Sequence, residues 1–160
     1  MLFRSFDLEG AGLPASARIG KATLSFYVWD PHNNATTKVC AFPVKTPWRE
    51  ATATWRQPQE GKAWQGGKSF VLGVDAGPPS GHVVVRPDMG SDTVDPPIEY
   101  QIDVTAIVQD WVRGTPNYGF AIVPVPDRAI DGGHASRFQV FASEHQRAQY
   151  TPKLVMQAGP

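Results

Sequence analysis

The side chains with the clearest potential for chemistry are aromatic. Tyr27 and Trp29 alternate with Phe26 and Val28, so in a strand these two rings share the face opposite to the aliphatic pair. If Phe26 and Val28 face the core, the two rings lie on the outer face of a sheet. A flat aromatic surface can stack on a sugar ring or be covered by a neighbouring protein module. Ordinary half-buried packing is the third interpretation.

Trp64 is a further candidate for sugar stacking, because the surrounding segment 61–67 is polar and rich in glycine. Packing against the core is the alternative for this ring. An acidic polysaccharide would also need cationic donors for its carboxylates, and Arg49 and Arg56 could supply them. The neutral overall charge of the chain gives no support for a large basic face.

Three carboxylates share one polar loop, at Asp88, Asp92 and Asp95. Carboxylate oxygens are hard ligands that suit calcium, but their spacing is not that of an EF-hand. Solvated turn residues are the other interpretation of this loop. Calcium is therefore the one cofactor that the sequence leaves open, and no other cofactor is expected.

Signatures of catalysis are missing from the sequence. It contains no nucleophile elbow, phosphate-binding loop or zinc-protease motif. Nothing marks a pair of carboxylates as the acid and base of a glycosidase. Cys40 is the only cysteine, which excludes an intrachain disulfide, and its strand-like surroundings predict a buried position. We expect a protein that is not an enzyme.

The elements that must position these side chains are predicted to be mainly strands. The chain has 160 residues, with 15 glycines and 15 prolines, so many turns punctuate one domain spanning residues 1–160. Trp48 and Trp55 bracket a connection without strand periodicity, where their rings are expected to cover the end of the core. About nine antiparallel strands are expected, near residues 2–8, 19–29, 37–44, 69–74, 82–86, 98–103, 118–125, 136–142 and 152–157. The predicted fold class is all-β, as a jelly-roll β-sandwich.

One short helix is predicted near residues 104–113, where apolar residues recur at helical spacing. Asp103 is expected to be its N-cap and Gly114 its left-handed terminator. Trp111 lies on the apolar face of this helix and is expected to pack in the core.

Charge and hydropathy exclude other classes of protein. The formal net charge is zero, whereas nucleic-acid-binding domains normally carry a basic excess. No stretch reaches the roughly 18 apolar residues that a membrane span needs. The first residues do not resemble a secretion signal, and Met1 could equally be a start placed inside a longer protein.

The order of several segments resembles the DNRLRE domain family. The run from Asp103 to Gly119, with Trp111 and Gly114 inside it, is the most specific part of the resemblance. The likeness covers nearly the whole chain, through segments 4–8, 22–28, 48–55, 102–114, 117–120, 137–138, 142–144 and 152–155. It implies a jelly-roll module of secreted or surface-anchored microbial proteins. One branch of that family is classed as carbohydrate-binding modules, with acidic polysaccharides such as alginate among the ligands.

The resemblance leads to two expected functions. The first is a non-catalytic carbohydrate-binding or adhesion module, extracellular or at the cell surface, with a polysaccharide as its partner. The second is a structural building block of an extracellular fibre or surface layer, which would contact neighbouring modules or copies of itself. Members of the family usually begin with a further segment that has no counterpart here. We expect the resulting open position to accept a strand from a partner.

Overall fold

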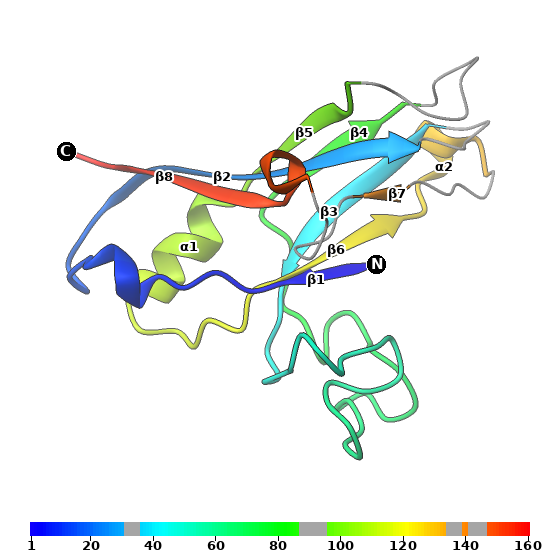
Figure 1. The fold of residues 1–160 in the computed structure, drawn as a ribbon, viewed down its shortest axis with the longest axis horizontal. Coiled ribbons are helices and arrows are strands. Elements are labelled where there is room, and N and C mark those ends of the chain that lie inside the picture. Colours follow the sequence, from blue (N-terminus) through cyan, green and yellow to red (C-terminus); the bar gives the residue numbers. More distant parts are fainter. Residues whose placement is uncertain (31–35, 87–95, 134–138, 141–146) are drawn as a thin grey trace.

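The computed structural model describes residues 1–30, 36–86, 96–133, 139–140 and 147–160. Within these ranges the fold is all-β, with most residues of the core in antiparallel strands (Figure 1). The eight strands are β1 (Leu2–Arg4), β2 (Ile19–Asp30), β3 (Thr37–Pro43), β4 (His82–Val85), β5 (Ile98–Asp103), β6 (Phe120–Val125), β7 (Gln139–Val140) and β8 (Lys153–Ala158).

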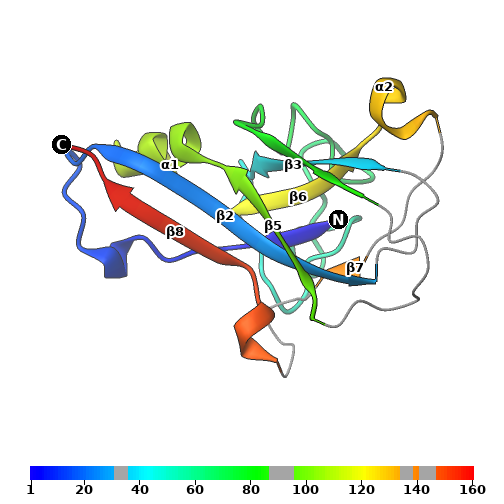
Figure 2. The same cartoon turned by 90° about the horizontal axis from the view of Figure 1, so that it is seen from above.

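The strands form two sheets of four strands each. Sheet A has the order β1-β6-β3-β4, and in sheet B the long strand β2 pairs with β5 on one side. Both β8 and β7 pair with β2, along its first part and its end respectively. Figure 2 shows β2, β5 and β8 side by side in one layer and β3 and β6 in the other. Every strand pairing in the described part of the chain is antiparallel.

Alternation along β2 and β3 produces a first hydrophobic core between the two sheets, here called the inter-sheet core. Leu24, Phe26 and Val28 are completely buried in it, which fits the period of two of a strand. Its buried members are Ile19, Ala22, Leu24, Phe26, Val28, Val39, Ala41, Val85, Ile102, Val104, Ile107, Val108, Trp111, Phe120 and Ile122. Both sheets and the helix α1 (Thr105–Val112) contribute side chains.

A second cluster covers the opposite face of sheet A. The residues of β3 and β6 that alternate with those of the inter-sheet core point into it, and a loop over residues 45–81 closes it from outside (Figure 1). We call it the loop-covered cluster; its buried members are Cys40, Phe42, Val44, Trp64, Phe70, Ala76, Ala121 and Val123. The central strands β3 and β6 of sheet A are therefore packed on both faces.

The helix α1 closely matches its prediction. Trp111 is 7% exposed and its ring lies 4.7 Å from that of Phe120. Gly114 has a φ of 107°, and the next amide, of Thr115, donates to the carbonyl of Asp110 at 3.0 Å, as in a Schellman ending. Gly114 thus ends the helix as expected.

The start of α1 differs from its prediction by one residue. Val104 occupies the N-cap position and makes no side-chain cap bond. The carboxylate of Asp103 instead accepts the amide of Thr105 at 2.9 Å, from one residue further out. That hydrogen bond is the leading reason why the pKa of Asp103 lies below its ordinary value. Asp103 therefore stabilises the first turn without being the N-cap.

A second short helix and two 3-10 turns complete the described structure. The helix α2 (Arg128–Asp131) begins with a cap from the Asp127 carboxylate, which accepts the amide of Ala129. The 3-10 turns are Glu9–Ala11 and Ala148–Tyr150. None of these three was expected, because each is too short to show a helical period in the sequence.

Two predicted strands are shortened or wrong. The predicted strand 69–74 is a series of turns with one bridge between Leu72 and Ala76, because the Asp75 carboxylate captures the amide of Val71 at 2.8 Å. The predicted strand 2–8 pairs only as β1, over Leu2–Arg4. The described chain therefore has eight strands instead of about nine. Most of the predicted strand 136–142 lies outside the described residues, which include only β7.

Candidate functional site

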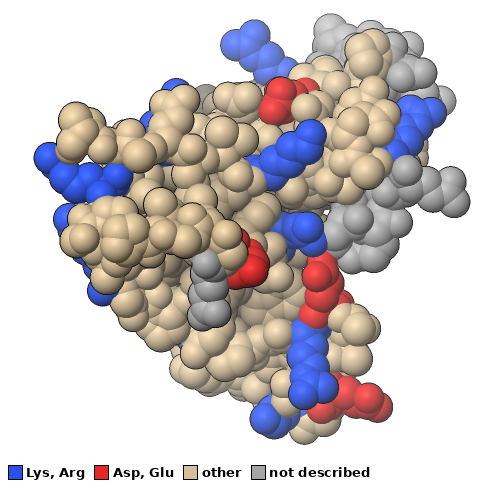
Figure 3. Space-filling view, turned by 60° about the vertical axis from the view of Figure 1, so that its left-hand side comes forward, with Lys and Arg blue, Asp and Glu red and all other residues tan. Residues whose placement is uncertain are grey.

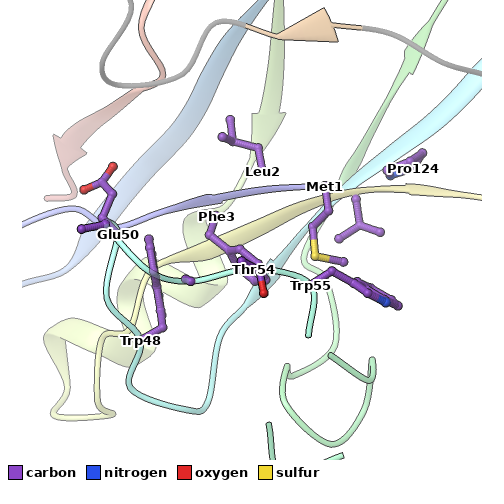
Figure 4. Close-up of a pocket in the computed structure, with 11 residues that line it drawn as sticks. Met1, Leu2, Phe3, Trp48, Glu50, Thr54, Trp55 and Pro124 are labelled. Atoms are coloured by element: carbon purple, nitrogen blue, oxygen red, sulfur yellow. The ribbon is translucent and has the colours of Figure 1, made fainter. Parts of the chain in front are cut away.

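A groove of about 1030 Å³ is present beside strand β1. It lies where β1 and β6 meet the first part of the 45–81 loop (Figure 4). Eleven residues line this aromatic groove: Met1, Leu2, Phe3, Trp48, Glu50, Ala51, Ala53, Thr54, Trp55, Val123 and Pro124. Most of these side chains are apolar, so the groove presents a hydrophobic surface with few polar groups.

Strand β1 is held against β6 by a close approach of two backbones. Gly119 has a φ of 77°, and a Cβ there would meet the carbonyl of Arg4 and lie 2.8 Å from the Cα of Ser5. Only glycine combines this conformation with so little space. The edge strand that forms one wall of the groove therefore depends on this residue.

Phe3 of β1 connects the groove to the loop-covered cluster beneath it. Its ring centroid lies 5.6 Å from that of Trp48, 5.3 Å from Trp64 and 5.1 Å from Phe70. Figure 4 shows Trp48 and Trp55 on opposite sides of Phe3. Contacts at these spacings are favourable for aromatic pairs, so the rings brace one another below the groove.

The two tryptophans of the groove differ in their hydrogen bonds and in their exposure to solvent. The indole N–H of Trp48 donates to the carbonyl of Tyr118 at 2.6 Å, which ties the loop to the chain before β6. Trp55 is 52% exposed, although its carbonyl accepts the amide of Phe70 at 2.9 Å. Trp55 was expected to cover the end of the core, but its backbone is anchored while half of its side chain faces solvent.

The polar groups of the groove are Glu50 and Thr54. Glu50 accepts a hydrogen bond from the Arg4 guanidinium at 2.9 Å in an ion pair. The Thr54 hydroxyl accepts the amides of Arg56 and Gln57 at 3.1 and 3.2 Å. Thr54 therefore stabilises its own turn and keeps the neighbouring Trp55 in place.

Asp75 organises the loop from inside, and sequence reasoning missed it. This carboxylate is fully buried and accepts amides of Gln65, Gly66 and Val71 at 2.7 to 3.3 Å. Hydrogen bonds of this kind satisfy a buried charge and fix the backbone around it. Nothing in the pattern of residues 73–81 indicates burial, because an aspartate before Gly and Pro is typical of a solvated turn.

Trp64, a predicted sugar-stacking residue, is in fact part of the loop-covered cluster. It is 2% exposed, and its indole N–H donates to the carbonyl of Thr54 at 3.0 Å. The prediction of stacking is therefore wrong, and the alternative of core packing is confirmed. The glycines around Trp64 make tight turns that carry the ring inward, which local composition alone does not reveal.

Arg49 and Arg56 lie on the same loop as the groove, and both are exposed. Neither belongs to the residues that line the groove. Their backbones brace the loop: the Arg49 carbonyl accepts the amides of Thr52 and Ala53. The prediction that these cations bind a ligand therefore stays a prediction.

Tyr27 and Trp29 do lie on the outer face of a sheet, as predicted, because Phe26 and Val28 are completely buried. Both rings are half-buried, and the ring of Tyr27 lies 5.1 Å from that of Tyr150. Burial, together with the nearby Glu99 carboxylate, raises the pKa of Tyr27. The pair belongs to sheet B, whereas the aromatic groove belongs to sheet A and its loop.

The outer face of sheet B also holds a smaller, polar depression of about 220 Å³. It is lined by Lys21, Thr23, Ser25, Glu99, Gln101, Val155 and Gln157, from β2, β5 and β8. Polar outward residues are usual on a solvated sheet face. The depression therefore adds hydroxyl, amide and charged groups near Tyr27 without an exposed aromatic ring.

Asp88, Asp92 and Asp95 lie outside the described residues, so the calcium prediction stays a prediction. Among the residues described, no three His, Cys, Asp or Glu side chains are grouped to hold a metal ion. Figure 3 shows basic and acidic side chains scattered over the visible face, without a field of one sign.

Comparisons of the chain with protein-family models, with curated proteins and with solved structures returned no match. The resemblance to the DNRLRE domain family therefore stays an expectation from the sequence. The described helices include none with the length and apolar character required to cross a membrane. What is established is an all-β protein of two antiparallel sheets with an aromatic groove beside an edge strand.

Proposed function

We propose that this protein is a non-catalytic carbohydrate-binding or adhesion module, and that the aromatic groove is its binding site. The observation that carries the proposal is Trp55, whose indole is half exposed at the border of the groove. The apolar face of a pyranose ring packs on such a surface while its hydroxyls remain hydrated or hydrogen-bonded. Glu50 and Thr54 are the polar groups within reach of those hydroxyls.

The rigidity of the groove supports this role. The turn that carries Trp55 is fixed by the hydroxyl of Thr54 and by the bond between the Trp55 carbonyl and the amide of Phe70. The stem of the loop is tied down by Trp48. A site that is ordered before binding loses less conformational entropy when the ligand arrives.

The finer assignment of fold and location belongs to the same proposal. Two antiparallel sheets around a common core support a jelly-roll β-sandwich, and the resemblance stated above adds an extracellular or cell-surface setting. A module of this kind binds its polysaccharide without chemistry, which agrees with a groove in which Glu50 is the only carboxylate among the lining residues.

Affinity gel electrophoresis with neutral and acidic polysaccharides tests the proposed site. Trp55→Ala should weaken retention about tenfold, since stacked aromatic contacts contribute about 0.5–1.5 kcal/mol beyond area burial. The double variant Tyr27→Ala/Trp29→Ala is the matched control on sheet B and should leave retention unchanged. The reverse result would move the site to sheet B, and absence of retention of the unmodified chain by any polysaccharide would contradict the function.

A second candidate function is assembly of a fibre or surface layer by strand addition. The observation that favours it is the position of β1 at the edge of sheet A, where its one strand partner in the described residues is β6. Edge strands offer unpaired backbone groups to another chain. Sedimentation velocity separates the candidates: concentration-dependent oligomers without glycan support assembly, whereas a monomer at all concentrations contradicts it.

A further inference from the structure

We infer that the aromatic groove selects uncharged pyranose chains and discriminates against uronate chains. This inference deepens the proposed function and rests on it, since it concerns the ligand class of the same groove. It also departs from the acidic polysaccharide that the sequence suggests, for which Arg49 and Arg56 were the expected donors.

The charge of the groove carries the inference. Of the eleven side chains that line it, Glu50 is the one with a formal charge, and that charge is negative. Arg49 and Arg56 lie on the same loop but outside the lining. A bound uronate would place its carboxylates beside Glu50, with no arginine or lysine among the lining residues and the α-amino group of Met1 as their one cationic group. Proteins normally recognise carboxylates with arginines, which bind in a bidentate manner, or with lysines, which act as point charges.

Arg4 does not change this conclusion. Its guanidinium is already paired with Glu50 at 2.9 Å, and its side chain is 22% exposed against 43% for Glu50. The more accessible partner of the ion pair is thus the carboxylate. An ionised carboxylate is an acceptor only, so it suits the hydroxyl donors of a neutral sugar and repels another carboxylate.

The apolar lining favours the same ligand class. Trp55, Phe3 and Trp48 present rings, and the alanines at 51 and 53 present methyl groups. Such a surface packs against the C–H face of a pyranose, while it cannot replace the water that a carboxylate loses on binding. Burial of a uronate here would therefore be penalised both by desolvation and by Glu50.

Two matched ligands test the selectivity: cellohexaose and the corresponding hexamer of glucuronate, titrated calorimetrically at low salt. We expect at least about fivefold tighter binding of cellohexaose, because two unit charges at contact distance repel by about 1 kcal/mol even in water. Glu50→Gln should strengthen hexaglucuronate binding about fivefold, whereas cellohexaose, which loses a charged acceptor for its hydroxyls, should bind somewhat more weakly. The glutamine retains an acceptor for Arg4, so the wall of the groove is preserved.

Two controls separate the local charge from other effects. Glu60→Gln removes the same charge from an exposed position of the loop outside the lining and should leave both affinities unchanged. Met1 also lines the groove, and burial lowers the pKa of its α-amino group below 8.0. The preference for cellohexaose should therefore persist at about pH 9, where this group is neutral.

Each outcome has a defined meaning. If hexaglucuronate binds as tightly as cellohexaose, or if only uronate polymers retain the chain, the selectivity is wrong and the carbohydrate-binding function stands. If Glu50→Gln and Glu60→Gln act alike, the preference comes from overall charge and the role of Glu50 is overturned. If no saccharide binds in either experiment, the proposed function and this inference both fall.

Discussion

The two faces of sheet A are buried in physically different ways. On the inner face, strands of both sheets and the helix α1 close the inter-sheet core with mainly aliphatic side chains. On the outer face, a loop with isolated bridges and turns closes a smaller cluster, in which Phe42, Trp64 and Phe70 are the buried rings. The inner face is sealed by regular elements, whereas the outer face is sealed by a segment that has almost no regular structure of its own.

The loop that closes the outer face is held by side-chain hydrogen bonds to backbone groups. Asp75 accepts backbone amides, and the indole N–H groups of Trp48 and Trp64 donate to backbone carbonyls. These bonds replace the strand ladders that stabilise the inner face. The aromatic groove therefore depends on a few polar contacts, although its lining is apolar.

The largest expected effects come from replacing two equally buried phenylalanines, one in the inter-sheet core and one in the loop-covered cluster. Phe26 is 0% and Phe70 is 1% exposed, and replacement by alanine typically costs about 3–5 kcal/mol in a core. We expect Phe26→Ala to lower the global free energy of unfolding by that amount in a denaturant titration. Phe70→Ala should instead open the 45–81 loop, seen as faster amide exchange there while the sheets stay protected. Equal global losses would show that the two regions unfold as one unit.

Asp75→Ala should have the next largest effect, confined to the outer face of sheet A. Amides of Gln65, Gly66 and Val71 would lose their common acceptor, and leaving buried donors unsatisfied costs about 1–3 kcal/mol each before relaxation. We expect a loss of about 2–3 kcal/mol, confined to the loop in amide exchange. The exposed Asp110 offers a matched control, since Asp110→Ala should change stability by less than about 0.5 kcal/mol. Protection of the loop in Asp75→Ala would refute the role given to this carboxylate.

The smallest expected loss of stability comes from replacing Asp103, which lies between β5 and α1. Its folded-state pKa is lowered below the ordinary value of 3.8 by its hydrogen bonds from Thr105. The stabilisation is therefore complete above pH 3.8 and is lost as the pH falls through the lowered pKa. Asp103→Ala should cost about 0.5–1 kcal/mol at neutral pH, as for a helix-cap contact. Thermal unfolding of the unmodified protein and of Asp103→Ala should converge as the pH falls below 3.8 and through the lowered pKa, and a constant difference would contradict this linkage.

The strands and the helix around the inter-sheet core could be predicted from the sequence because the spacing of their apolar residues is a local pattern. Alternation identified β2, and helical spacing with Gly114 identified the position of α1. Trp111 was correctly placed in the core for the same reason. The strand 69–74 failed because its apolar residues serve turns organised by Asp75, an interaction that no periodicity reveals.

The groove could be predicted only in part. The segment 48–64 was identified as a connection that holds three tryptophans. Trp64, a predicted surface ring, is buried, whereas Trp55, predicted to cover the core, is half exposed. Which ring points inward is decided by tight turns and by hydrogen bonds over distances of about ten residues, such as that from Trp64 to Thr54. Nothing in the sequence indicated that Glu50 belongs to the groove, because its ion-pair partner Arg4 lies on β1, 46 positions away in the chain.

Cys40 makes the outer face of sheet A directly observable. It is the only cysteine of the chain, it is 4% exposed within the loop-covered cluster, and burial raises the pKa of its thiol. The thiol therefore reacts only when the loop lifts away from β3. The rate at which a thiol reagent labels Cys40 therefore reports how often the loop opens. A bound saccharide that bridges the loop and β1 should slow this labelling.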